Sequence, residues 1–166
     1  MKLDRFTEKA QEAVSDANEA AFLKGHAEVA PWPLLAALLE QEDGLVPALF
    51  QKMQIDPARV RTMVAQQLDA MPTQEGGQTY PSADFRAALQ NAFAEAKGLK
   101  DQFVSTEHLL LALLKDRKSA VGEYFHSINV GRDGTNLNTA RGIKKWSPFR
   151  VYRSQRRLWG EQSLID

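Results

Sequence analysis

The sequence predicts an all-α fold made of two tandem four-helix repeats that are related by a pseudo-twofold axis. Apolar residues recur at spacings of three and four along the chain, as they do on the buried face of a helix. The same apolar pattern returns after an offset of 75 residues. No stretch alternates with period two for long enough to indicate a strand. The 166 residues allow one ordinary domain, or one domain with a tail, and can bury a substantial core.

The first predicted helix has a narrow apolar face and a recognisable start and end. That face consists of Ala10, Ala13, Val14, Ala17 and Ala21. Thr7 is the predicted N-cap, because its hydroxyl can accept a hydrogen bond from an unsatisfied backbone N–H of the first turn. Gly25 marks the predicted end of the helix.

Three further helices are predicted in the first repeat. A short leucine-rich helix is expected from about residue 31 to 40, with Pro31 in its first turn, where a missing N–H costs nothing. A third segment carries Leu45, Val46, Leu49 and Phe50. Asp56 then caps a fourth helix that ends near Met71.

A repeat follows a break at residues 72–81, which hold two prolines and two glycines. Shifting the chain by 75 residues aligns eleven identical pairs: Ala13/Ala88, Ala17/Ala92, Ala21/Ala96, Val29/Val104, Leu34/Leu109, Leu35/Leu110, Ala37/Ala112, Leu38/Leu113, Leu39/Leu114, Val46/Val121 and Phe50/Phe125. The cap Thr7 aligns with Ser82. The alternative is a coincidence between two alanine- and leucine-rich stretches, but the caps and breaks align as well. We therefore expect a first repeat at 1–71, a linker at 72–81, a second repeat at 82–133 and an atypical tail at 134–166.

The tail differs in charge and pattern from the body. Residues 1–130 hold 13 basic and 18 acidic groups, whereas residues 131–166 hold 8 basic and 3 acidic groups. Two glycines, Gly131 and Gly134, oppose a helix start where the first repeat opens its fourth helix. We interpret residues from about 134 to 159 as a locally shifted reading frame or a fragment's artefact. A coding sequence in which no compensating single-base changes restore a helical pattern would refute that interpretation.

Several classes of function are excluded or disfavoured by composition. The chain has no cysteine, so it has no disulfide, thiolate zinc site or cysteine nucleophile. Its three histidines have no partners at the spacing of a metal site or a catalytic triad, and no phosphate-binding G-x-x-x-x-G-K-[ST] motif is present. We therefore expect no catalysis, metal or cofactor in this chain. No apolar run approaches a membrane span and no secretory signal opens the chain, so a cytoplasmic location is expected.

Three stretches carry a family resemblance over roughly residues 1–130. They are the opening LDRFTEKAQEAV, the linker from LDAMP to QTYP, and the run EAKGLKDQFVSTEHLLLALL. The chain resembles the N-terminal Clp repeat domain of the Clp/Hsp100 AAA+ chaperones, and most closely the ClpB disaggregase branch. The resemblance implies an all-helical double Clp motif that engages unfolded or aggregated polypeptides or an adaptor. It also implies attachment to the hexameric ATP-driven AAA+ ring of the same parent protein.

The resemblance also implies which residues bind substrate. Thr7, Asp101 and Glu107 match the polar anchors of the family's substrate patch. Beside them, the loop from Lys100 to Thr106 leads into a leucine-rich helix whose neighbours include Phe103 and Leu109, and such a loop could line an apolar groove. A structural interpretation stands beside the functional one. In it, Thr7 is only an N-cap, Glu107 only complements the helix dipole, and Phe103 only packs in the core.

The basic tail supports an alternative function. Seven basic residues and no acidic one lie between Arg141 and Arg157, interleaved with Trp146, Phe149 and Tyr152. Such a segment could bind nucleic acid or another anionic surface through phosphate contacts and stacking. No recognised nucleic-acid motif accompanies it. Steeply salt-dependent binding to single-stranded RNA would favour this alternative over polypeptide capture.

Overall fold

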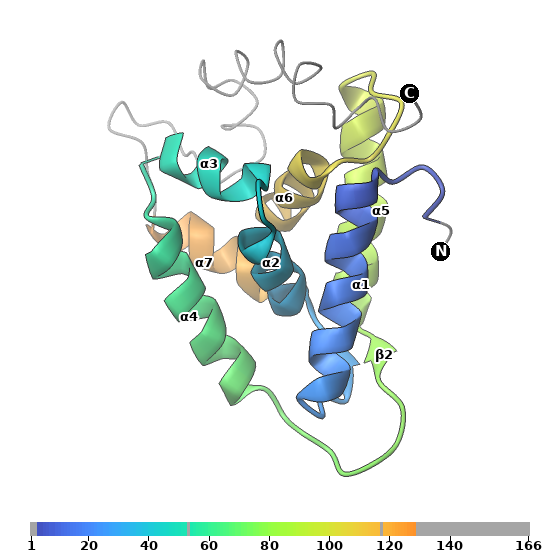
Figure 1. The fold of residues 1–166 in the computed structure, drawn as a ribbon, viewed down its shortest axis with the longest axis vertical. Helices are drawn as coiled ribbons and strands as arrows, with labels where there is room; N and C mark the ends of the chain where they lie inside the picture. Colours follow the sequence, from blue (N-terminus) through green and yellow to red (C-terminus); the bar gives the residue numbers. More distant parts are fainter. Residues whose placement is uncertain (1–2, 53, 117, 129–166) are drawn as a thin grey trace.

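The computed structural model describes residues 3–52, 54–116 and 118–128. The described elements are α1 (Glu8–Leu23), β1 (Glu28–Val29), α2 (Pro31–Glu40), α3 (Leu45–Lys52), α4 (Pro57–Ala70), β2 (Tyr80–Pro81), α5 (Ala83–Gly98), α6 (Thr106–Lys115) and α7 (Ala120–Ile128). Figure 1 shows the helices packed around α2 and α6. The all-α prediction is confirmed. No helix among the described residues is both long enough and apolar enough to span a bilayer.

The first repeat forms its helices where the sequence predicts them. The Thr7 hydroxyl accepts a hydrogen bond from the Ala10 N–H at 3.2 Å, which caps α1. Pro31 occupies the first turn of α2. The Asp56 carboxylate accepts from the Ala58 N–H at 3.0 Å and caps α4. These caps satisfy backbone donors that have no partner inside the helix.

The second repeat begins in the same way. The Ser82 hydroxyl accepts from the Phe85 N–H at 3.0 Å, which is the bond that Thr7 makes at the start of α1. The helices α5, α6 and α7 then correspond to α1, α2 and α3 at the offset of 75 residues. The predicted counterpart of α4 and the tail at 134–166 lie outside the described residues, so the predicted repeat boundaries stay predictions.

Two short backbone pairings relate the repeats by a half-turn. Val29 pairs with Pro81 in the parallel β1–β2 pair, and Phe6 forms a parallel bridge with Val104. An offset of 75 converts Phe6 into Pro81 and Val29 into Val104, so each pairing is the image of the other. The hydrogen bonds agree, since Thr7 N–H donates to Val104 O and Ser82 N–H donates to Val29 O, both at 3.0 Å. The sequence analysis found no strand because a two-residue pairing has no periodic signal.

The turn that follows the first helix of each repeat is also shared. Gly25 and Lys100 align at the same offset, and both have a positive φ, which is 73° for Gly25 and 61° for Lys100. The next residue of each repeat donates its N–H back to the helix at 2.9 Å, from His26 to Ala21 and from Asp101 to Ala96. Gly25 adopts this conformation without strain, whereas Lys100 carries a Cβ into it.

One core runs through both repeats. Leu34 and Leu109 are both fully buried, and they occupy matching positions of α2 and α6. Phe50 of α3 stacks on its own counterpart, Phe125 of α7, with ring centroids 5.4 Å apart and an interplanar angle of 18°. A pair of equivalent residues in contact must lie near the symmetry axis. The two repeats therefore form one hydrophobic unit and are not independent domains.

Candidate functional site

Four of the five residues predicted to bind substrate are buried. The exposed fractions are 1% for Thr7, 8% for Phe103, 1% for Glu107 and 0% for Leu109. The Asp101 side chain is 4% exposed. Leu109 belongs to the central core, whereas the others gather where the start of α6 meets the start of α1. In this arrangement the five side chains build the scaffold beneath a surface and expose little of their own area.

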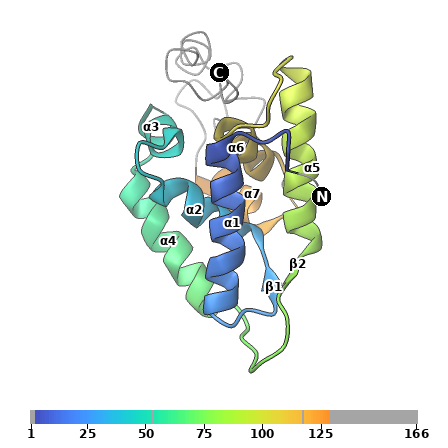
Figure 2. The ribbon, with the colours of Figure 1, turned by 45° about the vertical axis from the view of Figure 1, so that its right-hand side comes forward.

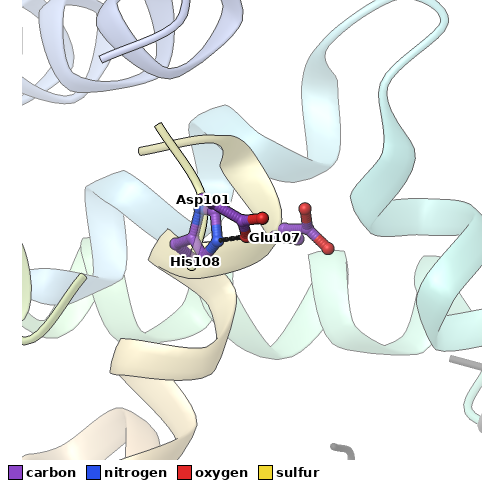
Figure 3. A group of neighbouring side chains, drawn as sticks. All are labelled: Asp101, Glu107 and His108. Carbon is purple, nitrogen blue, oxygen red and sulfur yellow. Dashed lines mark hydrogen bonds and ion pairs between the residues drawn. The ribbon is translucent and has the colours of Figure 1, made fainter. Parts of the chain in front are cut away.

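Asp101 and Glu107 meet His108 in one cluster (Figure 3). His108 Nδ1 accepts the Ser105 N–H at 2.8 Å, which fixes the neutral tautomer with its proton on Nε2. Nε2–H then donates to the Asp101 carboxylate at 2.6 Å. The Ser105 hydroxyl donates to Glu107 at 3.2 Å. These bonds tie the loop after α5 to the first turn of α6.

The same cluster offers an aspartate, a glutamate and a histidine within 4.8 Å of one another, which are potential metal ligands. The geometry does not suit a metal, because a ligating imidazole must offer a lone pair. The only lone pair of His108, on Nδ1, already accepts a backbone hydrogen bond. The cluster is therefore a hydrogen-bonded clasp, in which His108 joins the Ser105 backbone N–H to the Asp101 carboxylate.

Glu107 has no acidic counterpart in the first repeat. Trp32 stands at the matching place in α2, where it is buried and packs edge-on against Tyr124 of α7 with centroids 6.4 Å apart. The half-turn symmetry of the backbone therefore does not extend to the chemistry at the two helix starts.

A hollow of about 260 Å³ lies between α1 and α5, and we call it the α1–α5 hollow. Its apolar lining comes from Leu3, Val14, Pro81, Phe85 and Leu89. Its polar lining comes from Asn18, Arg86 and Gln90. Figure 2 shows α1 and α5 side by side and antiparallel along this side of the molecule. Val14, Phe85 and Leu89 are buried and form the floor, whereas the three polar residues are exposed at the rim.

The sequence analysis missed this hollow, because its two walls are about 70 residues apart in the chain. One signal was available. Val14 aligns with Leu89, and both extend the apolar stripe of an otherwise alanine-rich helix face. Two larger side chains at the edge of a narrow stripe hold neighbouring helices apart at that level.

Large apolar side chains are exposed at the C-terminal end of α1. Phe22 and Leu23 are 63% and 73% exposed, and Tyr80 of β2 is 61% exposed. Phe22 lies two turns beyond Val14 on α1, close to the stripe that lines the hollow. Exposed aromatic residues beside a concave surface are typical of binding sites.

Comparison with known proteins gives consistent matches. Residues 5–128 match the family described as "Clp repeat (R) N-terminal domain". The chain is 35% identical over 120 residues to the chaperone protein ClpB of Rhodopirellula baltica, covering 72% of this chain and 14% of that protein. It is 33% identical over 162 residues to ClpB of Bacteroides thetaiotaomicron, covering 92% of this chain and 19% of that protein. The chain thus spans less than a fifth of the length of these relatives.

Solved structures share the fold. The N-terminal domain of Hsp104 from Candida albicans superposes with a TM-score of 0.70 at 22% identity, covering 86% of this chain and 93% of that one. A ClpV N-domain in complex with a VipB peptide superposes with a TM-score of 0.65 at 18% identity, covering 83% and 88%. At these identities the likeness concerns the fold. The match over residues 5–128 shows that this chain belongs to the Clp repeat N-terminal domain family.

Proposed function

We propose that this chain captures exposed apolar segments of unfolded or aggregated polypeptides, or an adaptor, on behalf of a ClpB-like ATP-driven disaggregase. The observation that carries the proposal is the α1–α5 hollow, an apolar floor with a polar rim on the surface of a Clp repeat domain. The curated relatives are ClpB chaperones, and a ClpV N-domain of the same fold is known with a bound peptide. Unfolded chains differ from folded ones in exposing apolar side chains, which such a floor can bury.

The five sequence-predicted residues have an indirect role in this proposal. Thr7 N–H donates to the carbonyl oxygen of Val104, which lies just before α6, and so joins the two repeats. The His108 clasp holds Asp101 and Glu107 against α6. Phe6, next to Thr7, packs edge-on against Phe93 of α5 with centroids 5.1 Å apart. Thr7, Asp101 and Glu107 therefore support substrate binding by fixing the start of α1 and the start of α6, and Phe6 extends this contact to α5. Phe103 and Leu109 support it by packing inside the protein.

Each copy should bind weakly, because a hollow of this size buries few side chains and association has a large entropic cost. Tethering the domain six times around a ring would raise the apparent affinity by ~10²–10⁴ where geometry permits. Weak individual sites suit a motor that must also release its substrate. The ring, its substrates and its adaptors belong to the proposal.

Binding to an unfolded test protein tests the proposal. Fluorescently labelled, reduced and carboxymethylated α-lactalbumin is titrated with the 166-residue chain, and anisotropy is read. Asn18→Trp fills the rim of the hollow and should weaken binding at least tenfold. Gln66→Trp places the same bulk on an exposed amide position of α4 that does not line the hollow, and should leave binding unchanged. Absence of binding by the unmodified chain, or equal loss in both variants, would refute the proposal.

A further inference from the structure

We propose that the α1–α5 hollow selects extended apolar segments that are flanked by acidic residues, and that it discriminates against the same segments with basic flanks. This inference rests on the proposed function and specifies its substrate class. It follows from the size of the hollow, the polar groups at its rim and the distribution of charge along its two walls.

The size of the hollow limits what can enter. A volume of about 260 Å³ exceeds the roughly 150 Å³ of a cavity that takes up benzene. It is smaller than the ~300–1,000 Å³ pockets that enclose drug-sized ligands. One aromatic or leucine side chain fits with room for part of a neighbour, whereas the whole apolar face of a helix does not.

The rim favours an extended backbone over a helical one. Asn18 on α1 and Gln90 on α5 place one carboxamide on each wall. A carboxamide both donates and accepts hydrogen bonds, so it can pair with main-chain groups of a bound segment. The main chain of a helix has already satisfied those groups internally, whereas an extended chain offers them. A side chain on the floor with its backbone between the two amides is the arrangement that this rim accommodates.

The two walls differ in charge. On α5, Arg86 and Lys97 lie within about 60–80° of Leu89 around the helix axis at 3.6 residues per turn, and both are exposed. The matching positions on α1 are Gln11 and Phe22, which carry no charge. No acidic residue lines the hollow in the described part of the chain.

The acidic residues of α1 lie farther round the helix. Glu8 is about 120° from Val14 around the helix axis at the same periodicity, and Glu12, Asp16 and Glu19 are about 140–160° from it.

Arg86 lines the hollow and is the cation nearest its mouth. Lys97 lies on the same wall, about 12 Å farther along the axis of α5 than Leu89. Residues 1–130 hold 13 basic and 18 acidic groups, so the preference for acidic flanks depends on Arg86 and Lys97 acting at short range within an acidic domain. At physiological salt, screening over ~8 Å further restricts the effect to nearby charges.

Three synthetic peptides test the inference. They share a core of leucine, phenylalanine, leucine and valine, and each core is flanked on both sides by two glutamates, two glutamines or two lysines. Affinities for the 166-residue chain are measured by isothermal titration calorimetry in 150 mM NaCl. We expect the glutamate peptide to bind about three- to tenfold more tightly than the lysine peptide, as two exposed ion pairs would give. In 1 M NaCl the difference should largely disappear.

Two double variants locate the effect. Arg86→Glu with Lys97→Glu should reverse the preference. Arg59→Glu with Lys118→Glu makes the same change in net charge at exposed positions on α4 and between α6 and α7, and should keep the preference. Circular dichroism checks that each variant is folded.

The outcomes separate this inference from the proposed function. If all three peptides bind equally, or the preference survives in Arg86→Glu/Lys97→Glu, the charge inference is wrong. Binding of unfolded α-lactalbumin that is lost in Asn18→Trp would then still support the proposed function. If neither α-lactalbumin nor any peptide binds, the proposed function itself fails.

Discussion

Thr7→Ala separates the two roles that Thr7 can have, helix cap or direct substrate anchor. The substitution removes the hydroxyl that accepts the Ala10 N–H at 3.2 Å, and it removes a methyl group from a side chain that is 1% exposed. Losing an N-cap costs about 0.5–2 kcal/mol, and uncovering one buried methyl-sized group costs about 0.8 kcal/mol. We therefore expect the free energy of unfolding to fall by about 1.3–2.8 kcal/mol.

The assay for this variant is urea unfolding followed by far-ultraviolet circular dichroism, beside anisotropy of unfolded α-lactalbumin on the same preparations. Thr7→Ser keeps the cap and loses only the methyl, so it should cost about 0.8 kcal/mol. Ser82→Ala removes the matching cap of α5 and should cost about 1 kcal/mol. In all three, the folded protein should bind α-lactalbumin nearly as the unmodified chain does. A Thr7→Ala protein with unchanged stability and abolished binding would refute the scaffold role and make Thr7 a direct anchor.

Three further predictions follow from the core, the clasp and the sequence beyond the second repeat. Leu34→Ala and Leu109→Ala should each lower the free energy of unfolding in urea by about 2–5 kcal/mol, because both side chains are fully buried at equivalent places. A loss below about 1 kcal/mol for either variant would contradict the shared core. His108→Ala should lower the free energy of unfolding by at least about 2 kcal/mol in the same assay, since the buried Ser105 N–H loses its acceptor. An unchanged unfolding midpoint would show that the clasp does not stabilise the fold. Amides of α6 and α7 should exchange hydrogen faster than those of α2 and α3, because threonines 135 and 139 align in the sequence with the buried Val60 and Val64 of α4. Equal protection of the two helix pairs would refute this prediction.

The sequence predicted the helices closely because each has a local signal. Thr7 and Asp56 cap their helices as predicted, and the leucine-rich helix runs from Pro31 to Glu40 as its pattern indicates. The internal repeat added what a single helix cannot show, namely that the two halves are equivalent. Helical periodicity and capping are properties of short stretches of chain, so they can be read without knowing the tertiary structure.

The site was harder to predict because it depends on how distant segments meet. Phe103 and Leu109 have the composition of a groove lining, but the structure buries them. The loop from Lys100 to Thr106 is tied down by His108, and the sequence analysis did not assign that residue a role. The α1–α5 hollow arises only when two helices from different repeats pack side by side, and no local pattern reports that distance.

A titration of ¹⁵N-labelled chain with reduced, carboxymethylated α-lactalbumin, followed by two-dimensional nuclear magnetic resonance, tests the binding surface most directly. We predict that the largest amide shift changes fall on α1 and α5, at Val14, Asn18, Leu89 and Gln90. Changes concentrated on α3 and α4, with α1 and α5 unaffected, would contradict the assignment of the hollow as the place where unfolded polypeptide binds.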